Sequence, residues 1–534
     1  MKSKAAKPEA GVQFPRGKSG GRSSEQASKA VLAASVARVS PDTAAALLRE
    51  KNWRVNYPVH ILNHVRQCAK SPSDCITAAK EGLAAIHSSF EFVRDGQIMP
   101  LDQAMRSIDG VGGLTTHVIR GASPRSPTLP IPYKGGALSG ESLRNQVRKW
   151  GSAGTIEPSA TSSVEQVLAK PELLDLSKHY FVMLGAGSAL SPYETLLQCG
   201  ANIIAVDLHP KPAVWKRLIS LARSSPGTLT FPIRQSHSKP GDDDEALSRI
   251  AGCDLLTETP EIANWLLSLY PDRPITLGSY AYLDGEAFFR VSVAMDAIVQ
   301  KVIQRRQSTP SIAYLCSPTD IFGIPHAART QSLNAFNAWS FSAAWQVPVH
   351  YLSGRRFLVK GQGIDPVACT FADGSAGQIP VYDGVLLQQG PNYIMSKRLQ
   401  HWRAVVSVND GVLVSSNVAP ASATESVTSN PLLAAGYGGA EFFPPIEIFA
   451  PDTTKALMTY LLVADLFVGQ PKSLHPLQLF THNACHGGMW RFAFMLRSVN
   501  EVAAVLYWIT KYKLNYLAPL AVAAVATKRL RASL

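Results

Sequence analysis

Two tyrosine–lysine pairs have the spacing needed for proton transfer to a carbonyl oxygen. Tyr393 and Lys397 are four residues apart, and so are Tyr507 and Lys511, so each pair would share one face of a helix. In such a pair the lysine lowers the pKa of the phenol and can bind a ribose, while the tyrosine passes a proton to the oxygen as hydride arrives. Because the chain contains 16 tyrosines, one such pair is expected by chance, and the surrounding sequence must decide.

The context favours the first pair. Tyr393 and Lys397 begin a helical pattern over residues 393–408, which leads into an apolar strand pattern over residues 411–420. Tyr507 and Lys511 lie in an apolar C-terminal region, where a core helix or a membrane-surface helix is the simpler interpretation.

The stretch FVMLGAGSALSPYETLLQCGANIIAVD, residues 181–207, predicts a strand, a glycine turn, a helix and a second strand. Gly185 would allow the tight turn, and Gly187 would let a phosphate approach the helix N-terminus. Asp207 could accept hydrogen bonds from a ribose and would repel a 2′-phosphate, which favours NAD(H) over NADP(H). Leu190 stands where GxGxxG has its third glycine, so an S-adenosylmethionine site and a purely structural unit remain alternatives.

A histidine-rich stretch near the C-terminus does not predict a metal site. His482 and His486 are four residues apart, with Cys485 between them and His475 nearby. A Gly-Gly pair follows directly and would end a helix, and no further ligand is suitably spaced. These histidines are interpreted as structural groups or as polar groups of a substrate pocket.

The elements that would position these residues alternate between strand and helix from residue 180 onward. Strands are expected at 180–185, 201–207, 227–233, 253–258, 311–317 and 411–420, and helices at 191–200, 213–225, 242–252, 285–306 and 393–408. This rhythm predicts an α/β fold with a doubly wound parallel sheet covered by helices on both faces.

The composition divides the rest of the chain into regions that flank this sheet. The expected regions are 1–40, a disordered basic tail or organellar transit segment; 41–175, mainly helical; 176–430, nucleotide-binding, interrupted by an insertion at 321–385; and 431–534, helical and apolar.

The motifs of residues 180–430 resemble, in order, those of the short-chain dehydrogenase/reductase family. The similar segments are LGAGSAL, AVD, CSPTD, YIMSK and NVAPASAT. The resemblance implies a Rossmann-like domain with helical N-terminal and C-terminal extensions, in which Tyr393 is the general acid, Lys397 its partner and Ser317 a substrate-oxygen donor. It also implies a cofactor, preferably NAD(H), bound by Gly185, Gly187, Ser188, Leu190, Asp207, Asn417 and Pro420.

Several positions depart from the family pattern. The turn reads GAGSAL rather than GxxxGxG, LLTETP follows the expected fourth strand in place of Asn-Asn-Ala-Gly, and Ser292 replaces a helix asparagine. More than sixty extra residues separate Ser317 from Tyr393, and Ala421 replaces a glycine. A non-catalytic subunit of a larger, membrane-associated assembly is therefore kept as the second hypothesis, and an S-adenosylmethionine-dependent methyltransferase as the third.

The overall composition restricts the partners. The chain is 46% hydrophobic and only 17% charged, which favours a lipophilic carbonyl or alkene substrate. Of the net charge of +13, residues 1–40 carry +6 and residues 511–534 carry +5, so the charge describes two basic ends and not a nucleic-acid-binding face.

Cysteine usage and apolar runs bear on the compartment. The seven cysteines are scattered without a CxxC motif, and the N-terminus lacks an apolar signal core, which favours a reducing compartment, cytoplasmic or organellar. The apolar runs at 502–510 and 516–527 are shorter than the ~20 residues that span a bilayer, but they could form a peripheral membrane contact.

Overall fold

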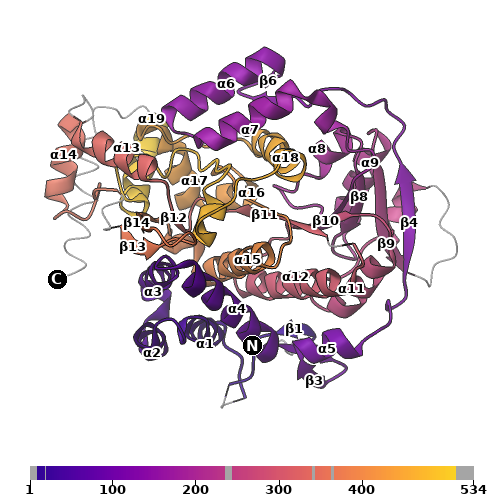
Figure 1. Cartoon of the computed structure of the whole chain (residues 1–534). Helices are drawn as coiled ribbons and strands as arrows, with labels where there is room; N and C mark the ends of the chain where they lie inside the picture. The colour runs from indigo at the N-terminus through magenta and orange to yellow at the C-terminus, as the bar shows by residue number, and fades with distance from the viewer. Residues whose placement is uncertain are drawn as a thin grey trace.

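A seven-stranded sheet forms the centre of the molecule (Figure 1). The computed structural model describes residues 9–17, 20–234, 243–308, 310–338, 343–361 and 366–512. The strand order is β16-β11-β10-β7-β8-β9-β4. The strands are β4 (Leu114–Arg120), β7 (Tyr180–Leu184), β8 (Asn202–Val206), β9 (Thr228–Arg234), β10 (Ile275–Ser279), β11 (Ser311–Cys316) and β16 (Val414–Val418).

All neighbouring strands are parallel except β4, which runs antiparallel to β9 at one edge. From β7 the chain moves outward through β8 and β9, then returns to the other side of β7 and moves outward through β10, β11 and β16. The direction reverses between β7 and β10, so the switch point of the strand order lies between these two strands at the carboxyl edge of the sheet.

Helices cover both faces of the sheet (Figure 1). Along β7, Val182 and Leu184 belong to one hydrophobic core, and Phe181 and Met183 to the other. The first core is covered by α4 (Pro72–Ser89), α11 (Thr259–Ser268), α12 (Glu286–Arg305) and α15 (Pro391–Asn409), and the second by α7 (Pro158–Ala169), α8 (Tyr193–Gln198), α9 (Pro212–Arg223) and α18 (Pro451–Phe467). The predicted α/β fold with a mostly parallel, helix-covered sheet is confirmed at this level.

The fourth parallel strand is not where the sequence pattern predicted it. Residues 253–258 form turns, and the strand is β10, twenty residues further on. The Asp254 carboxylate accepts a hydrogen bond from the Leu256 amide at 2.8 Å, and the Glu258 carboxylate accepts one from the Asp254 amide at 2.8 Å. These local bonds fold the short apolar run into the turn before α11.

The N-terminal region is ordered where the structure describes it. Helix α1 (Ser24–Val36) is capped by the Ser23 side chain and buries Val31, Leu32 and Val36, and β1 (Gly11–Gln13) pairs with β2 (Glu91–Arg94). The expectation of a disordered tail over residues 1–40 is therefore wrong for residues 9–17 and 20–40. Apolar side chains at helical spacing give this segment a face that it buries against the core.

Residues 41–175 form the expected helices together with strands that were not expected. The helices are α2 (Pro41–Arg49), α3 (Trp53–Cys68), α4, α5 (Leu101–Ser107), α6 (Gly140–Ala153) and α7; the added strands are β2, β3 (Gln97–Pro100), β4, β5 (Ile131–Tyr133) and β6 (Gly136–Leu138). The sheet edge formed by β4 thus comes from outside the predicted nucleotide-binding region.

The 321–385 segment has its own short elements between β11 and α15. These are β12 (Ile321–Gly323), α13 (His326–Asn337), α14 (Ala343–Leu352), β13 (Val367–Thr370), β14 (Ala376–Ile379) and β15 (Val381–Asp383). β12 pairs with β15, so the segment returns to the point at which it left.

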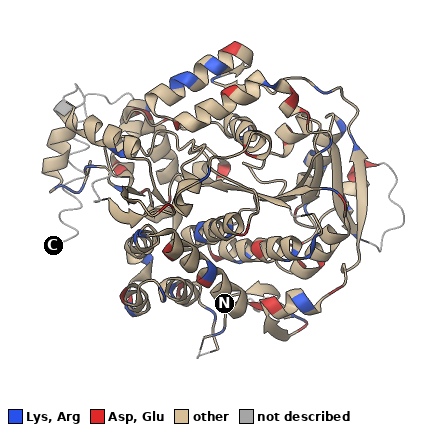
Figure 2. Ribbon diagram, in the orientation of Figure 1, with Lys and Arg blue, Asp and Glu red and all other residues tan. Residues whose placement is uncertain are grey.

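The C-terminal region is mostly helical. After β16 it contains α16 (Glu425–Thr428), α17 (Pro431–Gly438), α18 and α19 (Asn500–Lys511). Helix α10 (Asp244–Ile250) lies earlier in the chain, between β9 and α11. In the described part of the chain, no helix is both long and apolar enough to cross a membrane. The first apolar run, 502–510, lies in α19, which packs on α17, and the second run, 516–527, lies outside the described residues. Figure 2 shows basic and acidic residues interspersed along the helices.

Candidate active site

The loops that follow β7 and β10 pack tightly together at the carboxyl edge of the sheet. The amides of Tyr280 and Ala281 both donate to the Leu184 carbonyl oxygen at 2.8 Å. Gly185 has φ +90°, and a Cβ at this position would lie 2.3 Å from the Ala281 nitrogen. Only glycine fits both the backbone conformation and the space, so Gly185 fixes the turn where the strand order reverses.

The amides of the glycine turn are engaged within the fold. Gly185 and Ala186 donate to the Val206 carbonyl oxygen, at 2.8 and 3.2 Å, and Ser188 donates to the Gly185 carbonyl oxygen at 3.2 Å. Helix α8 is only six residues long and begins at Tyr193. The turn therefore does not lead directly into a long helix as expected, and a phosphate bound by these amides would have to replace internal hydrogen bonds.

Asp207 binds the glycine turn directly. Its two carboxylate oxygens accept from the Gly187 amide at 2.6 Å and the Leu208 amide at 2.8 Å. Burial raises the pKa of Asp207, and these two hydrogen bonds and the charge of Arg217 offset part of that rise. Because a carboxylate has about four acceptor positions, two remain for hydroxyl groups of a ligand.

Ser317, Tyr393 and Lys397 come together at the end of β11. Ser317 directly follows the strand, and Tyr393 and Lys397 lie in the first two turns of α15. Ser317 interacts with the Tyr393 phenol and offsets part of the rise in pKa that burial causes, while the Ser317 hydroxyl forms a hydrogen bond with the Thr319 hydroxyl at 2.8 Å. The Lys397 ammonium donates to the Leu315 carbonyl oxygen at 3.0 Å and to the Gln400 side chain at 3.2 Å, which ties the helix to the strand.

The 321–385 segment does not separate Ser317 from Tyr393 and Lys397, because its two ends pair with each other. Ile321 in β12 is paired with Asp383 in β15. On the α15 side, the buried Arg398 guanidinium donates to the Asp320 carboxylate and to the Ile321 carbonyl oxygen. The start of α15 is thereby held next to the end of β11 across the long segment.

Aromatic rings surround the Tyr393 phenol. The Phe288 ring centroid lies 5.6 Å from that of Tyr393, and the Tyr282 centroid lies 6.4 Å from it. Tyr282 is 43% exposed, so the group is close to solvent on that side. The sequence prediction missed both rings, since it placed the fourth strand too early. The loop SYAYLDG after the ITLGS strand carries the signal that could have found Tyr282.

Burial is the main cause of the pKa shifts of Tyr393 and Lys397. It raises the pKa of Tyr393, and the interaction with Ser317 offsets only part of that rise. Burial also lowers the pKa of Lys397, and Cys316 and the nearby Asp320 carboxylate oppose this shift. The expectation of a tyrosine pKa lowered by Lys397 is not met, and the phenol is protonated at neutral pH. It is therefore a proton donor.

Asn417 lies on the opposite face of the sheet from this group. Its amide nitrogen donates to the Asp465 carboxylate on α18 at 2.6 Å and to the Ser415 hydroxyl at 3.3 Å. Asn483 donates to the other oxygen of the same carboxylate at 2.9 Å. The side chain predicted to approach the nicotinamide thus holds α18 and the C-terminal segment against the sheet.

Pro420 is covered by the C-terminal segment as well. The Val418 carbonyl oxygen accepts from the Cys485 amide at 2.7 Å, and a Cβ on Gly487 would lie 3.7 Å from the Pro420 Cβ. Ala421 is buried beside it. Asn417 and Pro420, the two residues of the sixth-strand motif that were expected to bind the cofactor, thus contact other parts of the protein instead.

The histidine-rich stretch forms structural contacts. His486 pairs with the Glu157 carboxylate at 2.9 Å, and Arg491 donates to its second oxygen at 2.6 Å. Burial alone would raise the pKa of Glu157, but these hydrogen bonds more than offset it and lower the pKa to about 2. Among the described residues, no cluster of three or more His, Cys, Asp or Glu side chains is arranged to hold a metal ion.

The second tyrosine–lysine pair is remote from the strand ends. Tyr507 packs on Gly438 of α17, where an added Cβ would lie 2.3 Å from the Tyr507 ring. Lys511 lies over the rings of Tyr507 and Trp508, at 5.5 and 5.1 Å from their centroids. This pair stabilises the packing of α19.

No protein-family model and no curated protein matches the chain.

Proposed function

We propose that the protein is an NAD(P)H-dependent oxidoreductase of the short-chain dehydrogenase/reductase type. The observation that carries this proposal is the convergence of Ser317, Tyr393 and Lys397 at the end of β11. The strand order supports it. Counted along the chain from β7, the six parallel strands have the order 3-2-1-4-5-6, which is that of Rossmann dinucleotide-binding folds.

In this proposal Tyr393 protonates the substrate oxygen. The cofactor, when bound, supplies the hydride that adds to the carbonyl carbon or to an activated alkene. Tyr393 donates its hydroxyl proton to the oxygen, and Ser317 orients that oxygen by a hydrogen bond. The Lys397 ammonium, 5.9 Å from the Tyr393 ring centroid, stabilises the phenolate that remains.

Asp207 would select the cofactor. Its remaining acceptor positions suit the two hydroxyls of an adenosine ribose, and its negative charge would repel a 2′-phosphate. We therefore expect NADH to bind more tightly than NADPH. Gly185 and Gly187 would contribute by letting the turn pack on Ala281 and Asp207, which fixes the carboxylate, with Ser188 and Leu190 beside the cofactor.

The substrate is proposed to be lipophilic. Tyr282 and Phe288 provide an aromatic wall beside Tyr393, and Leu283 next to them is also exposed. A flat apolar carbonyl compound could stack there with its oxygen directed toward Ser317 and Tyr393.

The experiment that tests the proposal measures NADH oxidation with a panel of lipophilic aldehydes, ketones, quinones and enones. Tyr393→Phe should reduce turnover by about 10²–10⁴-fold without changing NADH affinity. Tyr507→Phe is a matched control because it removes the phenol of the other tyrosine–lysine pair. Turnover by Tyr393→Phe equal to that of the wild type would refute the proposed mechanism.

Two observations favour a second candidate, a non-catalytic subunit with a nucleotide-binding type of fold. The amides of the glycine turn are satisfied internally, and the sixth-strand motif is covered by residues 483–488. This candidate predicts that no nicotinamide cofactor binds and that Tyr393→Phe changes only stability.

A further inference from the structure

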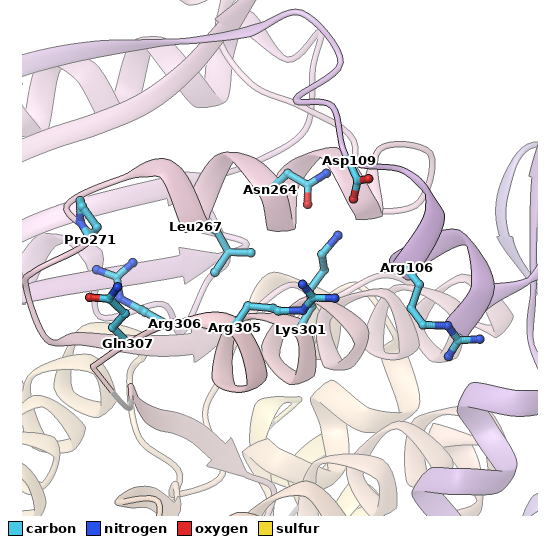
Figure 3. Close-up of a pocket in the computed structure, with 9 residues that line it drawn as sticks. All are labelled: Arg106, Asp109, Asn264, Leu267, Pro271, Lys301, Arg305, Arg306 and Gln307. Carbon is cyan, nitrogen blue, oxygen red and sulfur yellow. The ribbon is translucent and has the colours of Figure 1, made fainter.

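A basic pocket lies at the opposite edge of the sheet from the candidate active site (Figure 3). It has a volume of about 370 Å³ and lies between α11, the C-terminal end of α12 and the end of α5. Pro271 on its wall precedes β10, and Gln307 precedes β11, which places the pocket at the amino ends of the strands. The lining residues are Arg106, Asp109, Asn264, Leu267, Pro271, Lys301, Arg305, Arg306 and Gln307.

Positive charge in the pocket exceeds negative charge. Four basic side chains face one carboxylate, that of Asp109. Arg106 forms an ion pair with Asp102 at 2.9 Å, whereas within the described chain Lys301, Arg305 and Arg306 form none. Three cations without carboxylate partners therefore share the last turn of one helix.

Arg306 is buried and incompletely paired. It is only 8% exposed, and its two terminal nitrogens donate to backbone carbonyl oxygens of the loop before β10, those of Leu269, Tyr270 and Arg273. Its Nε atom is buried without a hydrogen-bond partner in the described chain. Burial lowers the pKa of Arg306 overall, and Asp272 is near enough to oppose this shift, although no ion pair joins these two described residues. A buried guanidinium without an ion pair is costly unless an anion is supplied.

Helix capping explains part of this cluster but not all of it. Cations near the C-terminus of α12 are stabilised by the helix dipole, and the Lys301 ammonium donates to the Met105 carbonyl oxygen at 2.7 Å. The far wall is held by Asn264, whose side chain donates to the carbonyl oxygens of Ile108 and Gly110. The exposed Arg305 guanidinium remains at the wall of the hollow that these bonds keep open, whereas the Arg306 Nε atom is enclosed by protein.

We infer that this pocket binds the phosphate group of a small ligand. Guanidinium groups bind phosphate oxygens through paired, charge-assisted hydrogen bonds, and the exposed Arg305 guanidinium lines the pocket, with the buried charge of Arg306 behind the same wall. Lys301 adds a point charge. Figure 3 shows Asp109 at the other end of the pocket from Arg306, where it would repel a second phosphate and so favour a monophosphate.

Equilibrium binding to the full-length protein tests this inference, with inorganic phosphate, pyrophosphate and adenosine 5′-monophosphate as probes at constant ionic strength. Arg305 is exposed, so Arg305→Gln should fold normally and weaken the binding of the preferred probe by about tenfold. Arg38→Gln, which changes an exposed arginine on the α1–α2 connection, is the matched control and should leave affinity unchanged.

Asp109→Asn gives a result that misfolding cannot imitate, because it should tighten phosphate binding by roughly threefold and reduce the preference over pyrophosphate. Tighter binding of inorganic phosphate than of the nucleotide would identify the free ion as the ligand, and the reverse order would identify a phosphate ester. The inference is overturned if the wild type binds none of the probes or if Arg305→Gln binds them as tightly as the wild type.

Discussion

Ser317 interacts with the Tyr393 phenol and offsets part of the rise in its pKa, although the entire 321–385 segment separates the two residues in the chain. The β12–β15 pairing and the Arg398–Asp320 ion pair bring the chain back to its starting point. The long segment is therefore accommodated without separating two residues that are proposed to act together.

The proposed role of Ser317 predicts a loss of rate and not of cofactor affinity. Ser317→Ala should lower turnover about 10–100-fold, because the substrate oxygen loses a hydrogen-bond donor in the transition state. Ser317→Thr keeps the hydroxyl and should retain more activity than the alanine variant. Steady-state kinetics with unchanged NADH affinity would support the role, and equal rates in all three proteins would contradict it.

The protonation of Tyr393 predicts the pH dependence of reduction. Burial raises the pKa of the phenol above its ordinary value near 10, so the proton donor is fully protonated throughout the neutral range. The rate of reduction attributable to this step should stay level up to about pH 10 and fall only above it. A decline centred near pH 7–8 that Tyr393→Phe abolishes would instead indicate a lowered phenol pKa.

The contact of Gly185 with Ala281 predicts a large loss of stability for Gly185→Ala. The added Cβ would lie 2.3 Å from backbone at φ +90°, so the free energy of unfolding should fall by about 3 kcal/mol or more. Gly374→Ala is the control. Gly374 has φ +82° but open space around it, and its substitution should cost only about 1 kcal/mol. Urea unfolding distinguishes the two, and equal costs would contradict the close packing.

The lowered pKa of Glu157 predicts that the free energy of unfolding decreases at acidic pH. Its pKa of about 2 in the folded protein lies below its ordinary value of 4.5, so its stabilising effect is complete above pH 4.5 and is lost as the pH falls toward 2. The change amounts to about 3 kcal/mol. Glu157→Gln should be less stable at pH 7 and should show a flatter dependence between pH 5 and 3, whereas the exposed Glu441→Gln should follow the wild type.

Much of the fold and part of the site could be predicted from the sequence, because the signals are local. β7, β8, β11 and α15 have clear apolar patterns, and Ser317, Tyr393 and Lys397 directly follow or lie within them. β10 could not be distinguished from the equally apolar 253–258 run, whose turn depends on hydrogen bonds made by Asp254 and Glu258.

Contacts between residues that are far apart in the chain could not be predicted from the sequence. Asn417 is bound by Asp465, 48 residues further along, and Glu157 is bound by Arg491, 334 residues away. No local pattern shows which face of β16 the asparagine occupies or which segment covers Pro420.

Equilibrium binding of NADH, NADPH and S-adenosylmethionine to the purified protein tests the central claim most directly, with Asp207→Ala as the variant and Asp284→Ala, at an exposed position, as the control. The proposed function predicts that the wild type binds NADH more tightly than NADPH and that only Asp207→Ala loses this preference. Binding of S-adenosylmethionine alone, or of none of the three, would contradict it.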